Sequence, residues 1–185
     1  DRPRDGWFVS GIMNTATRYL YSNAHVGARA RLTALEQIEA KNTIALLGKL
    51  GSLDGLDCLE IGAGAGSIAE WLSGQVGDAG SVTATDIEPV YLSNATYSVL
   101  RHDISTEELQ RENFDVAHIR HVLIHLDDPV SVLGKIAASL RPGGALLVEE
   151  SDLSSWRVCS GSPAKLQEQF SAGVDAVLRT YEQRG

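Results

Sequence analysis

The sequence predicts an α/β domain built on a doubly wound, mostly parallel sheet. A short apolar stretch at 57–61 is followed by three glycines at alternate positions and by a helical pattern from 67, which is the opening of a βαβ unit. Strand-like and helix-like stretches then alternate, as in parallel sheets with helices on both faces. Polar residues stand where the apolar strands stop, and ligands of such sheets bind there. These residues are Glu60, Asp86, Asp103, Arg120 and Glu150.

The amino-terminal segment has a different pattern from the rest of the chain. The first 25 residues mix aromatic, polar and glycine residues, and they predict a loosely structured arm with one short helix around Thr15–Tyr21. Apolar residues then recur at helical spacing between charges, which predicts a helix from Ala28 to Leu50 with Gly51 as its C-cap. We therefore expect an arm and helical cover over 1–50 and a ligand-binding core over 51–185.

The core contains predicted strands and the helices that connect them. The strands are expected at 57–61, 81–85, 97–101, 114–119 and 145–149. The helices are expected at 67–75, near 89–94, at 106–110, at 129–140 and at 163–181. The strands are near-continuous apolar runs, as strands buried on both faces should be. The run Arg-Pro-Gly-Gly at 141–144 predicts a sharp turn, because proline stops the helix and glycine accepts a positive φ.

Composition and charge limit the classes of function. The chain has 185 residues, of which 43% are hydrophobic and 22% charged, which is ordinary for one globular domain. A net charge of -8 without any run of Lys and Arg disfavours a nucleic-acid partner. No apolar stretch approaches the roughly 18–20 residues that a membrane span needs. Cys58 and Cys159 do not have the spacing of metal ligands. We expect the protein to be cytoplasmic.

The spacing of the glycines separates two classes of cofactor. A dinucleotide-binding turn has the pattern Gly-x-Gly-x-x-Gly and would need glycine at 67, where this chain has Ser67. Glu60 lies two residues before the first glycine, where its charge would repel a pyrophosphate but attract a cationic ammonium group. Asp86 ends the second strand, and a carboxylate there can accept hydrogen bonds from both ribose hydroxyls. A Tyr-x-x-x-Lys pair is also absent, which further disfavours a nicotinamide-dependent oxidoreductase.

The acidic-x-Gly-x-Gly-x-Gly run from Glu60 to Gly66 resembles motif I of the class I S-adenosylmethionine-dependent methyltransferases. The resemblance extends over 55–152, through the Asp-Ile pair after the third strand, the segment 114–126, and the turn and strand at 140–150. It implies the Rossmann-like methyltransferase fold, with S-adenosylmethionine as cofactor. Within this family the chain is most similar to small-molecule methyltransferases of bacterial secondary metabolism that have a helical N-terminal cover.

The resemblance also implies a role for each cofactor-site residue. Glu60 would lie near the methionine amino group, and the backbone around Arg120 would contact the methionine part. Asp103 and the N–H of Ile104 would read the adenine, although an N-cap role is the alternative for Asp103. Tyr19 and Tyr21 would contact cofactor or acceptor, or else pack within a helical cap. The predicted cofactor-binding residues are Glu60, Gly62, Ala63, Gly64, Gly66, Asp86, Ile87, Asp103, Ile104, Arg120 and Tyr21.

The sheet of this family usually has seven strands, of which the last two form an antiparallel hairpin. The sequence contains five predicted strands and stops after the helix that should lead into the sixth. We therefore expect a methyltransferase core that is truncated before its C-terminal antiparallel strands, with an open edge at the fourth and fifth strands. If these residues are the whole protein, we expect weak or absent catalysis.

A hydroxyl acceptor must lose a proton during methyl transfer, and histidine titrates in the range that suits a general base. His121 and His125 follow the fourth strand at i, i+4 spacing, so they share a face if that turn is helical, and they are the catalytic candidates. For His125 a structural packing role is favoured over the catalytic one. The pair could also bind a metal, but no third ligand is evident and we expect no metal. His118 lies within the fourth strand, where we expect core packing.

The sequence therefore predicts an enzyme that transfers a methyl group from S-adenosylmethionine to a small-molecule acceptor, with O-methylation favoured over N- or C-methylation. A non-methylating S-adenosylmethionine-binding protein or a cyclase on the same scaffold is the alternative, because its cofactor motifs would be the same. An NAD(P)-dependent oxidoreductase is a second alternative. A homodimer that shares elements is compatible with the arm and the unfinished sheet.

Overall fold

The five strands in the described part of the chain run parallel in one sheet. The computed structural model describes residues 23, 25–92, 96–152, 155–156 and 161–182. Neighbouring strands pair in parallel throughout the order β3-β2-β1-β4-β5. The strands are β1 Asp57–Ile61, β2 Ser81–Asp86, β3 Ser98–Arg101, β4 Phe114–Arg120 and β5 Leu140–Glu149. The doubly wound α/β fold that the sequence predicts is therefore confirmed.

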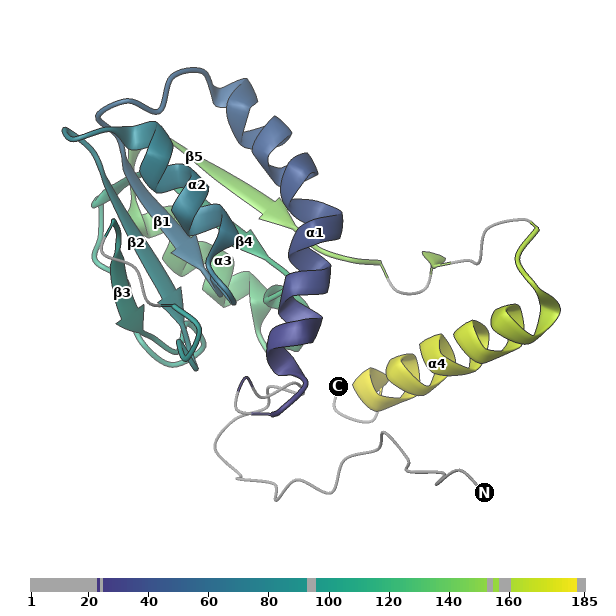
Figure 1. Cartoon of the computed structure of the whole chain (residues 1–185). Helices are drawn as coiled ribbons and strands as arrows, with labels where there is room; N and C mark the ends of the chain where they lie inside the picture. The colour runs from purple at the N-terminus through teal and green to yellow at the C-terminus, as the bar shows by residue number, and fades with distance from the viewer. Residues whose placement is uncertain (1–22, 24, 93–95, 153–154, 157–160, 183–185) are drawn as a thin grey trace.

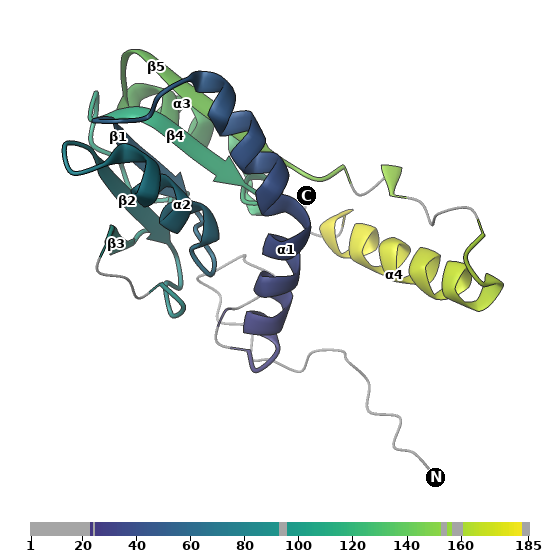
Figure 2. The same cartoon turned by 45° about the horizontal axis from the view of Figure 1, so that its top comes forward.

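Helices cover both faces of this sheet. They are α1 Ala28–Leu47, α2 Ser67–Val76, α3 Pro129–Ser139 and α4 Ala164–Glu182, with short 3₁₀ helices η1 Gly48–Leu50 and η2 Leu123–His125. The helices α1 and α2 lie on one face and α3 lies on the other (Figures 1 and 2). One apolar core fills the first interface around Leu47 and Leu72, and a second core contains Ile119 and Ile136. Burial on both faces explains the apolar character of the strands.

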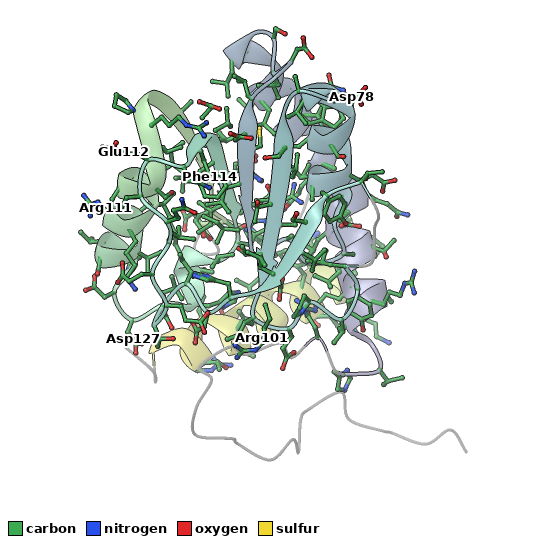
Figure 3. All side chains as sticks on the ribbon, turned by 90° about the vertical axis from the view of Figure 1, so that its left-hand side faces the viewer. Asp78, Arg101, Arg111, Glu112, Phe114 and Asp127 are labelled. Atoms are coloured by element: carbon green, nitrogen blue, oxygen red, sulfur yellow. The ribbon has the colours of Figure 1, made fainter. Side chains whose placement is uncertain are left out.

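The winding of the chain reverses between β1 and β4. The chain proceeds outward from β1 to β3 and then returns to place β4 and β5 on the other side of β1. Asp78, which precedes β2, marks the amino end of the sheet in Figure 3. Arg101 at the end of β3 and Asp127 after β4 lie toward the opposite, carboxyl end. Ligand crevices of open parallel sheets form at this end, beside the reversal point.

Local sequence signals set where two helices begin. Asp128 is the N-cap of α3, since its side chain accepts a hydrogen bond from the Ser131 N–H at 2.9 Å, and Pro129 is the first helical residue. The helix α2 begins after Gly66, whose φ of 94° lies in the left-handed region that favours glycine. The third glycine of the motif therefore serves the strand-to-helix turn.

Three connections differ from the predicted elements. The described residues of the segment 89–94 form turns, and 106–110 contain no helix. In the turn after β3, Asp103 accepts a hydrogen bond from the Ser105 N–H, and side-chain bonds of this kind compete with helix formation. The strand β5 begins at Leu140 instead of 145, and the Arg-Pro-Gly-Gly run forms a bulge within it, with Gly143 at a φ of 87°.

The helix α4 lies outside both layers, and its C-terminal part points back toward α1 (Figures 1 and 2). Trp156, in the segment before α4, stacks on Phe170 of this helix with ring centroids 6.4 Å apart. Although α1 and α4 are long, no helix within the described ranges is apolar enough to cross a membrane.

Replacement of Ile136 by Ala tests the packing of α3 on the sheet. Ile136 is 0% exposed, so the smaller side chain leaves a cavity and should lower the free energy of unfolding by about 2–4 kcal/mol. Val130 on the same helix is 77% exposed, and Val130→Ala should change this free energy by less than about 0.5 kcal/mol. Urea unfolding followed by circular dichroism measures both. Equal losses in the two variants would contradict the assignment of the buried face of α3.

Candidate functional site

A cavity of about 880 Å³ opens at the carboxyl ends of the strands. Ligand sites for drug-sized molecules measure roughly 300–1,000 Å³, so this cavity has room for a nucleoside cofactor beside a small second molecule. The predicted site residues that line it are Glu60, Gly62, Ala63, Gly64, Asp86, Ile87, Asp103, Ile104, Arg120, His121 and His125. Gly66 is not among the lining residues, and Tyr19, Tyr21 and the helix expected at Thr15–Tyr21 lie outside the described residues.

The glycine turn after β1 forms a backbone wall of this cavity. Gly62 has a φ of 67°, and a Cβ atom added there would overlap the side chain of Val122. The N–H of Gly64 donates to Asp86 Oδ2 at 3.0 Å, which fastens the turn to the end of β2. Because Gly62 has no side chain, a ligand can approach the main chain closely at this point.

Asp86 ends β2 at the cavity, with only 7% of its surface exposed. Its Oδ1 atom accepts a hydrogen bond from the Glu88 N–H at 2.8 Å and one from the side-chain amide of Asn23 at 3.4 Å. Burial raises the pKa of the Asp86 carboxyl group, and the hydrogen bonds from the Glu88 and Gly64 N–H groups oppose this rise in part. These bonds hold the carboxylate in one orientation, as a residue that binds ribose hydroxyls requires.

Asn23 is a cavity residue that the sequence analysis missed. It is 2% exposed, and its side-chain amide donates to the carbonyl of Glu88 at 3.1 Å. Its Oδ1 atom is buried and has no hydrogen-bond partner among the described residues. Buried polar atoms without a partner are uncommon, so this oxygen is a place where a hydrogen-bond donor of a ligand would be stabilised. No motif surrounds Asn23 in the sequence, and nothing there could have identified it.

Two carboxylates of α1 also reach the cavity. Glu36 Oε1 accepts a hydrogen bond from the N–H of Ser67 at 3.1 Å, and so it pairs one of the free N–H groups at the start of α2. Glu39 Oε2 lies 2.5 Å from His121 Nε2 and 3.7 Å from Arg120 Nε. Helical periodicity shows only that such residues avoid the core, so the sequence could not assign them to the site.

Arg120 ends β4, and its side chain is tied to α1. Its Nη1 donates to Thr43 Oγ1 at 2.7 Å, beside the ion pair with Glu39. The guanidinium group thus joins the carboxyl end of β4 to the helix that covers it.

The prediction that His121 and His125 share one helical face is wrong. The η2 helix contains only Leu123–His125, and His121 precedes it at a φ of 55°. A non-glycine residue in the left-handed region is strained by roughly 1–3 kcal/mol, and such residues cluster at functional sites. The Nδ1 atom of His121 lies 3.4 Å from Ser151 Oγ, while its Nε2 atom faces Glu39. Both histidines nevertheless line the cavity.

Glu60, His118 and the half-buried Glu149 form a row across β1, β4 and β5. His118 Nδ1 lies 2.6 Å from Glu60 Oε2, and His118 Nε2 lies 2.9 Å from Glu149 Oε2. Burial by itself lowers the pKa of His118, but the two carboxylates outweigh it and raise this pKa above the ordinary value. The expected burial of His118 is confirmed, since its side chain is 0% exposed. Packing is not its whole role, because both ring nitrogens have carboxylate partners.

Asp103 makes local hydrogen bonds in the turn after β3. Its Oδ1 atom accepts from the N–H and the hydroxyl group of Ser105. Burial raises the pKa of Asp103, but the hydrogen bonds from Ser105 and Thr106 and the charge of Arg101 outweigh it, so the pKa is lowered. This bonding resembles the capping alternative, although no helix follows. The adenine-reading role of Asp103 and Ile104 stays a prediction.

Glu150 and Cys58 do not line the cavity. Glu150 Oε1 accepts hydrogen bonds from the N–H groups of Val122 and Leu123 at 3.0 and 2.7 Å, and so it shapes the turn after β4. Cys58 is buried in β1, where burial raises the pKa of its thiol to about 12. In the part of the chain that the structure describes, no group of three or more His, Cys, Asp or Glu side chains is placed to hold a metal ion.

Comparison with known families identifies the class of protein. Residues 29–179 match the model of a methyltransferase domain. Because this match covers most of the chain, the chain belongs to the methyltransferase domain family. The predicted class, a class I methyltransferase with S-adenosylmethionine as cofactor, is therefore confirmed.

Individual relatives agree with this assignment. The chain is 39% identical over 97 residues to "Methyltransferase str2" of Strobilurus tenacellus, over 51% of this chain and 35% of that protein. It is 31% identical over 123 residues to a ubiquinone biosynthesis O-methyltransferase of Xylella fastidiosa, over 60% of this chain and 49% of that protein. A solved methyltransferase of Aquifex aeolicus, described as SAM dependent, matches with a TM-score of 0.58 and 20% identity over 74% of this chain and 78% of its own, which confirms the fold. The chain spans half or less of the length of these two curated relatives.

Replacement of Gly62 by Ala should disturb the backbone wall. The left-handed φ costs an alanine roughly 1–2 kcal/mol, and the added methyl group would displace Val122. We therefore expect a lower melting temperature and weaker binding of S-adenosylmethionine. Gly74 lies within α2 with no atom close to an added Cβ, so Gly74→Ala should stabilise the protein by up to about 1 kcal/mol. Thermal melts measure the melting temperature, and calorimetric titration measures the affinity for S-adenosylmethionine. If Gly62→Ala binds S-adenosylmethionine as tightly as the unmodified protein, the glycine turn is not part of the cofactor site.

Replacement of Asp86 by Ala removes the carboxylate predicted to bind ribose. The loss of a charged hydrogen-bond acceptor should weaken the binding of S-adenosylmethionine by ~1–3 kcal/mol, as measured by calorimetric titration. Asp78 is exposed at the opposite end of the sheet, as Figure 3 shows, and Asp78→Ala should leave the affinity unchanged. An unchanged affinity in Asp86→Ala would exclude the ribose role.

Proposed function

We propose that this chain binds S-adenosylmethionine across the carboxyl ends of β1, β2 and β4. The backbone wall at Gly62, the oriented carboxylate of Asp86 and the buried, unpartnered oxygen of Asn23 support this placement. Asp86 would hold the ribose hydroxyls, and Glu60 would hold the ammonium group of the methionine part. The cofactor, when bound, supplies an electrophilic methyl group on a sulfonium centre.

We further propose that the methyl acceptor is a hydroxyl group of a small molecule and that His121 is the general base. The observation that carries this proposal is the contact of 2.5 Å between Glu39 Oε2 and His121 Nε2 at the cavity wall. A carboxylate accepts hydrogen bonds, so it favours the tautomer with the proton on Nε2. The Nδ1 atom then carries the lone pair and can take the proton of an acceptor hydroxyl. Ser151 Oγ, 3.4 Å from Nδ1, indicates the direction from which a hydroxyl can approach.

The charge of the cavity disfavours an anionic acceptor. Carboxylates outnumber guanidinium groups among the lining residues, so an anionic acceptor would be repelled. The carboxylates are Glu36, Glu39, Glu60, Asp86, Asp103, Asp127 and Asp128, and the guanidinium groups are Arg31 and Arg120. Leu32, Leu35 and Trp156 add apolar surface to the same cavity, which suits an apolar or aromatic compound that bears a hydroxyl group.

The sequence offers two alternative functions for this chain. A non-methylating cofactor-binding protein or a cyclase would have the same cofactor site, so it remains the alternative function. A nicotinamide-dependent oxidoreductase is disfavoured because the chain belongs to a methyltransferase domain family. Homodimer formation, a cytoplasmic location and the exclusion of nucleic-acid partners stay predictions.

A methyl-transfer assay tests this function. S-adenosylmethionine labelled in its methyl group would be incubated with the protein and a panel of simple phenols, catechols and alcohols, with primary amines as the comparison. Label in the hydroxyl compounds would support O-methylation. Label in the amines alone would contradict the proposed acceptor class. Tight binding of S-adenosylmethionine without transfer to any compound would favour the non-methylating alternative.

Replacement of His121 by Asn separates the two candidate bases. Asn tolerates the left-handed backbone better than most residues, so the fold should be retained while the base is lost. We expect the turnover rate to fall by about 10²–10⁴-fold, with little change in the affinity for S-adenosylmethionine. His125→Asn is the matched variant at the other histidine of the cavity and should have a much smaller effect. A large loss in His125→Asn alone would transfer the role of base to His125.

A further inference from the structure

The row of Glu60, His118 and Glu149 has a protonation state that its geometry restricts. Both ring nitrogens of His118 lie within hydrogen-bond distance of a carboxylate oxygen, at 2.6 and 2.9 Å. An ionised carboxylate only accepts hydrogen bonds, and a neutral imidazole has only one N–H to donate. With both carboxylates ionised, the two contacts require an imidazolium ion, which donates from both nitrogens. The row then has two negative charges and one positive charge, with a net charge of one negative unit.

The three residues differ in their relation to the cavity. Glu60 lines it, whereas His118 and Glu149 are not among the lining residues. The Glu60 side chain is 5% exposed, so a partner rather than water must stabilise its charge. The imidazolium ion compensates part of the negative charge of the row and fixes one oxygen of each carboxylate. His118 and Glu149 can thus act on the cavity only through Glu60.

We propose that His118 and Glu149 are positioning residues that orient Glu60 and give the row the net negative charge that receives the ammonium group of the amino-acid part of S-adenosylmethionine. This inference rests on the proposed binding of that cofactor at the strand ends. The role of Glu149 follows from charge. With His118 and Glu60 alone the row would be neutral, and the second carboxylate supplies the net negative charge that attracts an ammonium group.

The other titratable groups near His118 are not charge partners of its imidazole ring. Arg120 lies two residues further along β4, but it is paired with Glu39 and Thr43 of α1. Cys58 lies two residues before Glu60 on β1, and burial raises the pKa of its thiol to about 12, so it is neutral at physiological pH. Glu60 of β1 and Glu149 of β5 are therefore the charged groups that contact the imidazole.

Two ligands that differ in the amino-acid part test the proposal in the intact chain. S-adenosylhomocysteine carries the ammonium group, whereas 5′-methylthioadenosine has the same nucleoside without it. In His118→Gln and in Glu149→Gln, the dissociation constant of S-adenosylhomocysteine should rise roughly ten- to a hundredfold, as expected for a charged hydrogen bond. The dissociation constant of methylthioadenosine should change less than about twofold. Calorimetric titration measures both ligands, and Glu149→Gln keeps a hydrogen-bond acceptor for His118 if His118→Gln does not fold.

Cys58→Ala is the matched control for damage to the sheet. Cys58 is 0% exposed on the same strand as Glu60, and it does not line the cavity. This variant should lower the melting temperature and leave the dissociation constants of both ligands unchanged.

The effect of pH follows from the raised pKa of His118. The imidazolium ion is fully present below the ordinary value of 6.5, and it is lost as the pH rises through the higher pKa of the folded protein. The ratio of the S-adenosylhomocysteine dissociation constants in His118→Gln and in the unmodified protein should therefore be largest near pH 6 and fall at alkaline pH. Titration of the ligand itself cancels in this ratio. Histidine-labelled NMR should show a His118 signal, absent from His118→Gln, that stays protonated to a higher pH than an exposed histidine does.

The outcomes separate this proposal from the proposed function. If the unmodified protein binds neither ligand, the proposed function fails. If it binds S-adenosylhomocysteine and the two variants bind it equally well, only the role of His118 and Glu149 is overturned. Equal losses of affinity for both ligands would also overturn it, because the residues would then act on the fold as a whole. A selective loss for the ligand with the ammonium group supports it.

Discussion

The hydrogen bond between Glu60 and His118 is the interaction on which much of the site depends. It joins the central strand β1 to its neighbour β4 near their carboxyl ends, where β1 continues into the glycine turn and β4 continues into the turn with His121. A buried charge is costly unless it is paired, so neither residue can be placed there without the other. Glu60 and His118 lie opposite each other in the register of β1 and β4. The glycine turn and the candidate base His121 therefore both follow strands that this one hydrogen bond connects.

The helix α1 completes the site from the opposite side. Its sequence predicts only a cover for the sheet, yet Glu36 and Glu39 reach the start of α2 and the end of β4. Through Glu39 and Thr43, the helix holds both Arg120 and His121. The cavity is thus formed between the ends of the strands and a helix that precedes all of them in the chain. A segment outside the sheet thus gives a sheet fold shared by many proteins a cavity with its own lining residues.

The fold could be read from the sequence because its signals are local. Apolar runs and glycine turns predicted the five strands within a few residues, and the Gly62–Gly66 run with Asp86 pointed to the correct end of the sheet. Errors arose where side-chain bonds within a short loop replace a helix, as around Asp103, and where a bulge extends β5 backward to Leu140. The partners of His118 could not be predicted, because they lie on two other strands and depend on register. The helical pairing of His121 with His125 failed because the backbone of His121 is left-handed, which no spacing of residues reveals.

The left-handed backbone at His121 has a consequence for the engineering of this protein. A search for more stable variants would select glycine or asparagine at this position, since either relieves the strain at a φ of 55°. The same change would remove the proposed base. Stability and activity thus make opposite demands on one residue, and a library screened for heat resistance alone should accumulate stable, inactive proteins at this site.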